Sequence, residues 1–374
     1  MNTLETDMEM NIKKDIVVIG AGPIGCYAAY LLAKSGHQVS VYEEHAELGS
    51  PIQCTGILTG EFDKFNFPKD SFLVNTINKI EVYSPKQKTT IQQKDYIICR
   101  RRFDNFLADL AKKEGAKIFL SHSFVRKEGR QLIIKDLLNK VEKNISPDVV
   151  IAADGPLSPT AKAYGFYYHQ RKNYYGIQAT VKGNFDSQMI KTYFGNEVCP
   201  NLFAWIVPES STIARVGLAT TKNTRHYFDR FMQEHNFIAL GIQAGTIPVY
   251  HPKQKLKKDN CYAVGDASTY VKATTLGGIV PGLKQAEILV DCINNNKDYE
   301  REVKHLRKQM WTHLQIHKIL NKFSDKDWDS LLSYINQPKI QKIFESYTRD
   351  NPIPLVTKTL LKEPRLLYFT KYLF

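Results

Sequence analysis

Three closely spaced glycines between two apolar segments constrain the fold of this chain more than any other feature. We expect a strand over residues 15–19 and a helix over residues 26–35. The turn between them contains Gly20, Gly22, Pro23 and Gly25. Gly20 allows the tight turn, Gly22 lets the backbone approach a pyrophosphate, and Gly25 lets the helix pack against the strand. This arrangement predicts a dinucleotide-binding strand–turn–helix unit.

Acidic residues follow the glycines at the distance that such a unit requires. A second strand, predicted over residues 38–42, ends on Glu43 and Glu44. A carboxylate here can accept hydrogen bonds from ribose hydroxyls, and the free N–H groups of the preceding helix can bind phosphate. An ordinary glycine-rich turn is the alternative, but it does not require the strand, the helix and the acid together.

The composition is that of a globular protein with a sizeable core. The chain has 374 residues, of which 43% are hydrophobic and 24% are charged, and this length suggests two or three domains. No segment holds the run of about 20 apolar residues that a membrane span needs. Residues 1–14 lack the apolar core of a signal peptide. We therefore expect a cytoplasmic protein whose residues 1–12 form a loose tail.

The net charge of +13 suggests a partner or a charged surface. Basic residues cluster at residues 100–102, at residues 253–258 and in the C-terminal region. Nucleic acid is not expected, because the chain contains no recognised DNA- or RNA-binding module. An anionic membrane surface is the better candidate, since it attracts basic patches by about 1 kcal/mol per Lys or Arg. A solvated basic surface explains part of the charge equally well.

The cysteines and histidines do not predict a metal site. Six cysteines are scattered along the chain with no C-x-x-C pair, which disfavours a zinc site or a disulfide scaffold and is typical of a reducing compartment. His313 and His317 are four residues apart on a predicted helix and could present two metal ligands. The sequence offers neither an adjacent catalytic Glu nor a third ligand, so we expect no bound metal.

Hydrophobic periodicity divides the chain into three parts. We expect residues 12–75, 95–165 and 258–297 to form a discontinuous Rossmann-type domain. Residues 76–94 and 166–257 are expected to form an inserted antiparallel sheet, because the second segment is rich in Tyr, Thr and Val with strand periodicity. Residues 298–374 have a helical pattern. The predicted fold is α/β with an added antiparallel sheet and a C-terminal helical region.

Individual elements follow from the same patterns. Strands are expected at residues 77–83, 89–92, 96–99, 117–120, 131–136, 149–152, 176–181, 189–194, 202–207, 214–219 and 261–264. Residues 46–60 are expected to form a loop. A helix with apolar positions from Phe103 to Leu110 is expected to end at Gly115, and further helices are expected over residues 227–240 and 278–294.

Four separated segments carry polar residues and glycines in a characteristic order. They are the glycine turn with Glu43, Arg100 at a helix start, Asp154-Gly155, and Gly265-Asp266. This set resembles the superfamily of FAD-dependent monooxygenases and reductases built like aromatic hydroxylases. The resemblance implies that Arg100 contacts FAD, that Asp154-Gly155 lies near the dinucleotide, and that Asp266 binds the ribityl hydroxyls. A plain surface position is the alternative for Arg100.

Three more segments narrow the resemblance. Residues 49–56, 193–208 and 272–279 are similar to the Pro-x-x-Cys-x-Gly loop, the Tyr-x-Trp-x-Phe-Pro motif and the Lys-Pro-Thr-Thr-Gly-Gly-Gly-Ile segment of geranylgeranyl reductases. The resemblance covers nearly the whole chain and is greatest to the archaeal digeranylgeranylglycerophospholipid reductases. Ordinary core packing of the aromatic residues and a plain helix start are the alternatives.

This resemblance implies roles for particular residues. Cys54 would lie near flavin and substrate, in a positional role, and a buried inert cysteine is the alternative. The implied substrate wall contains Phe203, Trp205 and Pro208, and the helix N-terminus facing the flavin pyrimidine edge contains Gly277, Gly278 and Ile279. The chain departs from the family pattern at Phe203, Val207, Ala219, Ala273 and Leu276. Leu276 replaces a glycine and adds bulk beside the expected flavin.

The activity implied by the resemblance is FAD-dependent reduction of isoprenoid carbon–carbon double bonds, on geranylgeranyl chains of membrane glycerophospholipids. Reduced flavin would give hydride from N5 to one alkene carbon, and an unidentified acid or water would give a proton to the other. The chain has no second glycine fingerprint, so the electron donor, NAD(P)H or ferredoxin, is expected to dock transiently. A peripheral position on the inner face of the cell membrane fits this substrate.

Three alternatives remain open for this fold. A flavin monooxygenase would consume dioxygen during turnover. A lipid-binding protein with a degenerate flavin site would use no electrons, and Ala273 and Leu276 are the residues that favour it. A non-redox cyclase would add no hydrogen to its product.

Overall fold

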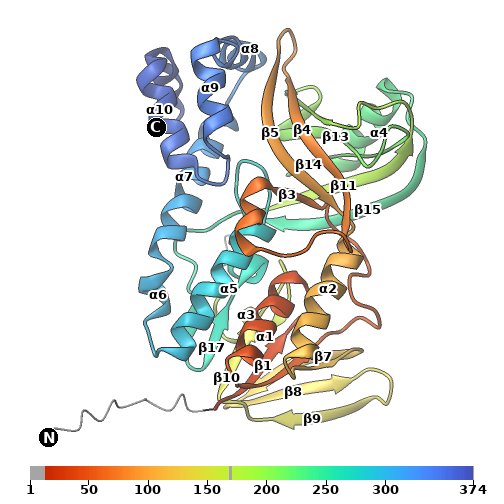
Figure 1. Cartoon of the computed structure of the whole chain (residues 1–374), viewed down its shortest axis with the longest axis vertical. Helices are drawn as coiled ribbons and strands as arrows, with labels where there is room; N and C mark the ends of the chain where they lie inside the picture. Colours follow the sequence, from red (N-terminus) through yellow and green to blue (C-terminus); the bar gives the residue numbers. More distant parts are fainter. Residues whose placement is uncertain (1–12, 168–170, 374) are drawn as a thin grey trace, which may run out of the picture.

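The computed structural model describes residues 13–167 and 171–373, so the tail expected at residues 1–12 lies outside the described residues. Figure 1 shows a mixed α/β region at the end of the molecule where the chain begins and a large, strongly twisted sheet at the opposite end. A column of C-terminal helices stands along one side of both regions. The predicted fold class, α/β with an added antiparallel sheet and a helical C-terminal region, is confirmed.

A six-stranded sheet carries the glycine turn. Its order is β16-β17-β10-β1-β2-β6, and all neighbours are parallel except β16 and β17. The strands are β1 (Asp15–Ile19), β2 (Gln38–Tyr42), β6 (Lys117–Phe119), β10 (Val149–Ala152), β16 (Lys257–Lys258) and β17 (Cys261–Ala263). Ile16, Val18 and Ile151 are fully buried, as expected for central strands of a parallel sheet that is covered on both faces.

Three helices pack together beside this sheet. They are α1 (Pro23–Lys34), α2 (Arg100–Lys113) and α5 (Ile279–Asn294), and α1 contacts the other two. The backbone N–H of Gly20 donates to the Tyr42 carbonyl over 2.8 Å, which fixes the turn after β1 to the end of β2. The predicted strand–turn–helix–strand unit and the end of the helix near Gly115 are confirmed.

A three-stranded sheet, β7-β8-β9, extends from the same region. It contains β7 (His122–Glu128), β8 (Gln131–Asp136) and β9 (Val141–Ile145). Only the middle strand is predicted by the sequence, because β8 buries Leu132, Ile133 and Ile134 whereas neither neighbouring strand has a buried residue. A strand that offers its neighbour hydrogen bonds but little apolar surface leaves no periodic signal.

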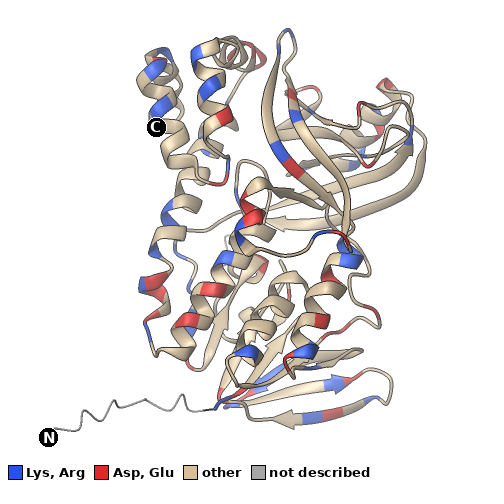
Figure 2. Cartoon of the chain, viewed as in Figure 1, with Lys and Arg blue, Asp and Glu red and all other residues tan. Residues whose placement is uncertain are grey.

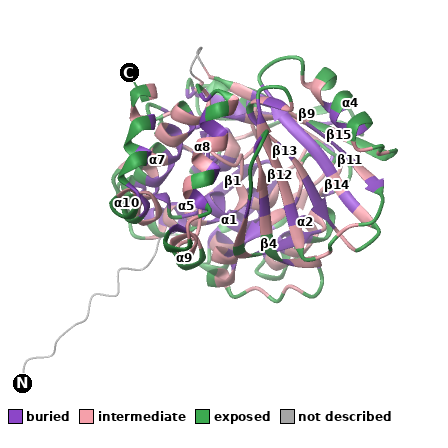
Figure 3. Ribbon diagram, turned by 90° about the horizontal axis from the view of Figure 1, so that it is seen from above, coloured by how far each residue is buried: buried purple, intermediate pink, exposed green. Residues whose placement is uncertain are grey.

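The second large sheet has eight strands in the order β15-β11-β14-β13-β12-β4-β5-β3. Its elements are β3 (Ile57–Thr59), β4 (Leu73–Tyr83), β5 (Lys88–Ile98), β11 (Asn173–Lys182), β12 (Met189–Gly195), β13 (Cys199–Pro208), β14 (Ile213–Thr220) and β15 (Ala239–Pro248). The parallel pair β4–β12 joins the hairpin β4–β5 to the strands that follow residue 173. Central strands such as β14 are buried along their length (Figure 3).

Three local expectations differ from the structure in this sheet. The segments expected at residues 89–92 and 96–99 form one strand, β5, which also crosses the expected domain border at residues 94–95. The helix expected over residues 227–240 is shorter: α4 (Thr224–Glu234) ends before Asn236, which has φ +53°, and β15 begins at Ala239. The loop expected at residues 46–60 contains β3 and leads into the 3₁₀ helix η1 (Gly60–Phe65).

The C-terminal residues form a set of helices that contacts the second sheet. They are α6 (Tyr299–Glu302), α7 (Lys304–Leu320), α8 (Asp325–Ile335), α9 (Pro338–Ser346), α10 (Pro352–Lys362) and the 3₁₀ segment η3 (Pro364–Leu373). Helix α8 contacts β5 and β12, and α9 contacts β5. Among the described helices, none combines the length and the apolar character needed to cross a bilayer.

Candidate active site

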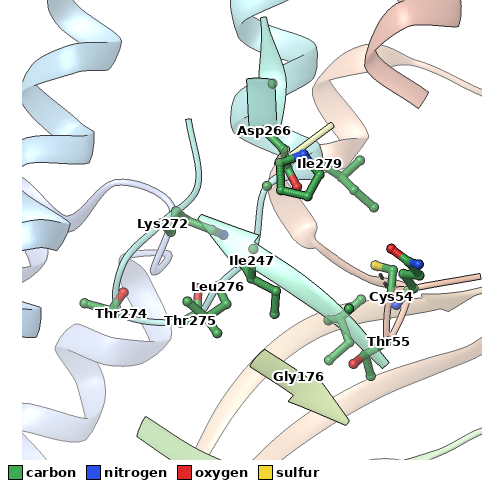
Figure 4. A pocket seen from close by; sticks show the side chains of 18 of the residues that line it. Cys54, Thr55, Gly176, Ile247, Asp266, Lys272, Thr274, Thr275, Leu276 and Ile279 are labelled. Atoms are coloured by element: carbon green, nitrogen blue, oxygen red, sulfur yellow. Dashed lines mark hydrogen bonds between the residues drawn. The ribbon is translucent and has the colours of Figure 1, made fainter. Parts of the chain in front are cut away.

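One cavity of about 1010 Å³ connects the glycine turn with the C-terminal helices. Its polar end is formed by the turn after β1, by the ends of β2 and β10, and by residues 265–266. Its other end lies between the second sheet and helices α7, α8 and α10 and is lined mainly by apolar side chains. Figure 4 shows the middle of the cavity, which is lined by Cys54, by Asp266 and by the loop that carries Lys272 and Leu276.

The glycine turn has no room for side chains where the chain segments approach. Gly20 has φ +100°, and a Cβ atom built on it would lie 2.5 Å from the Ala153 carbonyl oxygen. A Cβ on Gly25 would collide with the Gly20 carbonyl. Gly22 instead faces open space and caps α1, whose first residue is Pro23. The first N–H groups of α1 therefore remain available to an anion in the cavity.

Glu43 holds the turn in place. Its Oε2 accepts a hydrogen bond from the Ala21 N–H over 2.8 Å, and its Oε1 lies 2.6 Å from His45 Nδ1. The Glu43 side chain is 12% exposed and lines the cavity, as does Glu44. A carboxylate fixed beside the turn in this way can also accept hydrogen bonds from a sugar hydroxyl.

Arg100 begins α2 and points into the protein rather than to the surface. Its guanidinium group donates to both Asp104 carboxylate oxygens, over 3.1 and 3.0 Å. Burial alone would lower the pKa of Arg100, but Asp104 and the Cys54 thiol raise it overall. Cys54 Sγ accepts from the Gly56 N–H over 3.3 Å. Arg100 and Cys54 thus lie together in the cavity wall, and the surface alternative for Arg100 is wrong.

Two half-buried aspartates, Asp154 and Asp266, flank the polar end. Asp154 accepts hydrogen bonds from the Thr160 N–H, over 2.9 Å, and from the Ser158 hydroxyl. Burial raises the pKa of Asp266, while the nearby Arg100 and Arg171 lower it. The pKa of Asp266 is raised overall, and the two arginines limit the rise. Its carboxyl group lines the cavity, where it can accept hydrogen bonds from hydroxyl groups.

The segment before α5 brings the predicted glycines against Asp266 and Lys272. Gly278 caps α5, which begins at Ile279, and a Cβ on Gly278 would lie 2.8 Å from Asp266 Oδ1. A Cβ on Gly277 would lie 2.9 Å from Lys272 Cε. Leu276, at the position of a family glycine, has φ +55° and lines the cavity without filling it. Here too, glycine is required by close approach of chain segments.

Trp205 forms the sheet side of the apolar end. It pairs with Gly217 across β13 and β14, and a Cβ on Gly217 would lie 2.8 Å from Trp205 Cζ2. Phe203 lines the same wall, and the centroid of its ring is 6.0 Å from that of Trp205. Pro208, the third predicted wall residue, is not among the residues that line the cavity. Its carbonyl accepts a hydrogen bond from Asn75 Nδ2 over 3.0 Å, at the far end of β13.

Much of the apolar end comes from residues that the sequence analysis did not single out. Strands β11 and β15 contribute Gly176, Gln178 and Gly245 to the lining. The C-terminal helices contribute Ile316, Leu320, Trp328, Leu331, Leu355, Val356 and Leu360. The apolar stripes of these helices were visible in the sequence. A stripe shows which residues are buried but not what they face.

The two histidines of α7 have different surroundings. His313 lines the cavity, and its Nδ1 lies 2.7 Å from Thr274 Oγ1. His317 Nε2 lies 3.0 Å from the Tyr174 hydroxyl and 2.8 Å from Asn321 Nδ2. Within residues 13–167 and 171–373, no group of three or more His, Cys, Asp or Glu side chains has an arrangement suited to a metal ion.

The comparisons with known proteins agree with this geometry. Residues 18–64 match the NAD(P)-binding Rossmann-like domain. A digeranylgeranylglycerophospholipid reductase of Methanocaldococcus jannaschii is 30% identical over 97% of this chain and 99% of its own length. This chain belongs to the digeranylgeranylglycerophospholipid reductase family. The predicted resemblance is confirmed, and the chain is a flavin-dependent oxidoreductase with FAD as its cofactor.

Solved structures share the complete fold. A geranylgeranyl bacteriochlorophyll reductase-like protein of Thermoplasma acidophilum has a TM-score of 0.83 and 23% identity, with 97% of this chain and 99% of that chain covered. A flavin-dependent brominase has a TM-score of 0.70 and 15% identity, with 95% and 100% covered. At these identities the structures show that the fold is common to flavin enzymes and do not distinguish between their reactions.

Proposed function

We propose that this protein reduces carbon–carbon double bonds in geranylgeranyl chains of membrane glycerophospholipids. The observation that carries the proposal is one continuous cavity that joins a dinucleotide-type turn to an apolar compartment behind Trp205. Family membership supports the same substrate class, because the relatives are named for it. An apolar compartment of this kind suits a long hydrocarbon chain better than a small polar substrate.

The cavity residues suit FAD, and we propose which of them hold it. Around the nucleotide half these are Gly20, Gly22, Pro23, Gly25, Glu43, Glu44, Asp154 and Gly155, and around the flavin half Cys54, Arg100, Gly265, Asp266, Gly277, Gly278 and Ile279. All of them except Gly25 line the cavity, and Gly25 lies against Gly20. We propose that residues 12–75, 95–165 and 258–297 form the FAD-binding domain. Residues 76–94 and 166–257 would bind the substrate, and residues 298–374 would close the cavity.

The protein's part in the reaction is binding, orientation and exclusion of water. When bound and reduced by an external donor, FAD would supply the hydride in this class of chemistry. Glu43 and Asp266 accept hydrogen bonds from sugar hydroxyls of the cofactor, and Phe203 and Trp205 hold the hydrocarbon chain against the loop at Gly277. An isolated alkene has no group that attracts hydride, so a proton must be delivered at the same time. The surrounding apolar wall keeps bulk water away from this step.

Electrons must reach the cofactor from outside the chain. We propose that NAD(P)H or ferredoxin docks transiently, and that the protein works peripherally at the inner face of the cell membrane. The net charge of +13 supports contact with anionic lipid.

The proposal is tested by incubating the purified holoprotein anaerobically with dithionite and a digeranylgeranylglycerophospholipid. Mass spectrometry should show two added hydrogens for every double bond reduced. A monooxygenase would leave the lipid unchanged without dioxygen, a cyclase would rearrange it without a change of mass, and a lipid carrier would return it unaltered. Either an unchanged lipid or a rearranged lipid of the same mass would contradict the proposal.

A further inference from the structure

The outer face of the last two helical segments exposes large apolar side chains. Leu361 is 77% exposed, Leu367 52%, Tyr368 63% and Leu373 40%. They lie on α10 and η3. The 16 residues from 358 to 373 that contain them also include four exposed cations, Lys358, Lys362, Arg365 and Lys371. We call these eight residues the C-terminal surface. Exposed apolar residues gathered at one place indicate an interaction site, whereas isolated ones do not.

The charge of this surface has one sign. The only acidic residue between residues 352 and 373 is Glu363, which is 2% exposed and is held by ion pairs with Arg365 and Lys339. Figure 2 shows basic residues along α10 near the C-terminus, and the sequence of that helix contains two lysines and no acidic residue. Lys371 also lies 3.6 Å from the centre of the Tyr368 ring. Apolar and aromatic side chains between cations are the composition of an interfacial membrane helix.

The inner face of the same two segments belongs to the cavity. Leu355, Val356, Thr359 and Leu360 of α10 line its apolar end, and so do Leu366 and Phe369 of η3. Leu361 and Leu367 immediately follow lining residues and point away from them into solvent. The C-terminal surface is therefore the outside of the cavity's apolar wall, separated from the inside by one layer of helix.

We propose that the C-terminal surface docks the protein on an anionic bilayer and thereby places the apolar end of the cavity against the lipid. This inference rests on the proposed function, because an enzyme that reduces lipid chains must take these chains from the bilayer without exposing them to water. The positive charge selects an anionic surface, and the leucines and Tyr368 enter the boundary between headgroups and hydrocarbon. A protein partner is the alternative occupant of this surface, and the vesicle-binding experiment below distinguishes it from a bilayer.

The proposal is tested by co-sedimentation of the FAD-loaded protein with vesicles of phosphatidylcholine alone and with added phosphatidylglycerol. Wild-type protein should bind the anionic vesicles at least about tenfold more strongly, and salt should weaken this binding. The variant Leu361→Ser/Leu367→Ser, and separately Lys358→Gln/Lys362→Gln, should each reduce it about tenfold. The matched control Ile238→Ser/Leu240→Ser changes two exposed residues at the start of β15, 79% and 56% exposed, and should bind like wild type.

Activity on detergent-solubilised lipid distinguishes this inference from the proposed function. None of the four substituted C-terminal residues lines the cavity, so both variants should keep wild-type activity in detergent while losing it on vesicles. Absence of vesicle binding by the wild type, or unchanged binding by both variants, would overturn the docking surface and leave the reductase proposal standing. Absence of lipid reduction in detergent by a vesicle-binding wild type would overturn the reductase proposal instead.

Discussion

The Lys272 ammonium group and the Asp350 carboxylate form a buried ion pair that joins the loop before α5 to the residues before α10. Each side chain is 4% exposed. Burial alone would raise the pKa of Asp350, but Lys272 and Arg349 hold it well below its usual range. The pair therefore ties the proposed flavin loop, through Lys272 beside Gly277, to the helices that close the apolar end.

Removing one partner of this pair should be costly. Asp350→Asn leaves the Lys272 charge buried without its counter-ion, and we expect the free energy of unfolding to fall by about 3–5 kcal/mol in urea titrations. Asp291→Asn is the matched control, because its pair with Lys297 is 47% and 44% exposed and should contribute less than about 1 kcal/mol. Equal losses from the two substitutions would show that the buried pair has no special role.

The contact between Trp205 and Gly217 makes a second prediction. A methyl group at residue 217 would lie 2.5 Å from the Ile177 carbonyl and 2.8 Å from the Trp205 ring. Gly217→Ala should therefore cost about 1–3 kcal/mol of stability and raise KM for the lipid by displacing the wall. Gly241→Ala is the control in β15, where a Cβ would meet no atom within 4 Å. A wild-type KM in a folded Gly217→Ala protein would argue against Trp205 as a substrate wall.

Glu43 should matter to cofactor affinity through its charge. Glu43→Gln keeps the shape of the side chain but weakens its bonds to the Ala21 N–H and to sugar hydroxyls. A hydrogen bond to a charged group contributes about 1.5–3 kcal/mol, so the Kd for FAD should rise about 10- to 100-fold in fluorescence titrations. Glu128→Gln is the control, because its native carboxylate forms an exposed ion pair with Arg126 and does not line the cavity; it should retain the wild-type Kd. Tight FAD binding by Glu43→Gln would contradict the proposed nucleotide end.

Two buried histidines should make the fold sensitive to mild acid. Burial and Lys272 lower the pKa of His313 to about 3 despite Asp350, and burial and Lys172 lower the pKa of His317 to about 4. In the unfolded chain each histidine has a pKa of about 6.5. At pH values between the folded and unfolded pKa values, the unfolded chain therefore binds more protons than the folded chain, and the free energy of unfolding falls as the pH falls. From pH 7 to pH 5 we expect each histidine to cost about 2 kcal/mol.

Urea titrations at these two pH values measure the effect. The double variant His313→Gln/His317→Gln should lose most of the difference in unfolding free energy between pH 7 and pH 5. An unchanged difference in that variant would mean that other groups cause the acid sensitivity.

Local signals explain which parts of this protein can be predicted from its sequence. The glycine turn, Glu43 and Asp266 belong to short segments whose spacing reflects direct backbone contacts, such as that of Gly20 with Ala153. Strand β15 is missed because it contains Gly241 and Gly245 and exposes Leu240 and Ile242, which breaks the alternation expected of a strand.

Contacts between distant segments leave no such signal. Lys272 and Asp350 are 78 residues apart, and neither residue type indicates a buried partner. Which side of α10 lines the cavity likewise depends on how the C-terminal helices pack on the second sheet. The sequence left two interpretations of Arg100 open, because Cys54, one of its two partners, comes from a different segment of the chain.

The central claim is that one cavity holds FAD at the glycine turn and an isoprenoid chain at Trp205. It is tested most directly by an anaerobic single turnover, in which protein with stoichiometric reduced FAD is mixed with digeranylgeranylglycerophospholipid and both products are analysed. We expect one double bond to be reduced for each FAD oxidised, and slower oxidation of FAD in Trp205→Ala. Oxidation of FAD with no gain in lipid mass, or no oxidation at all, would contradict it.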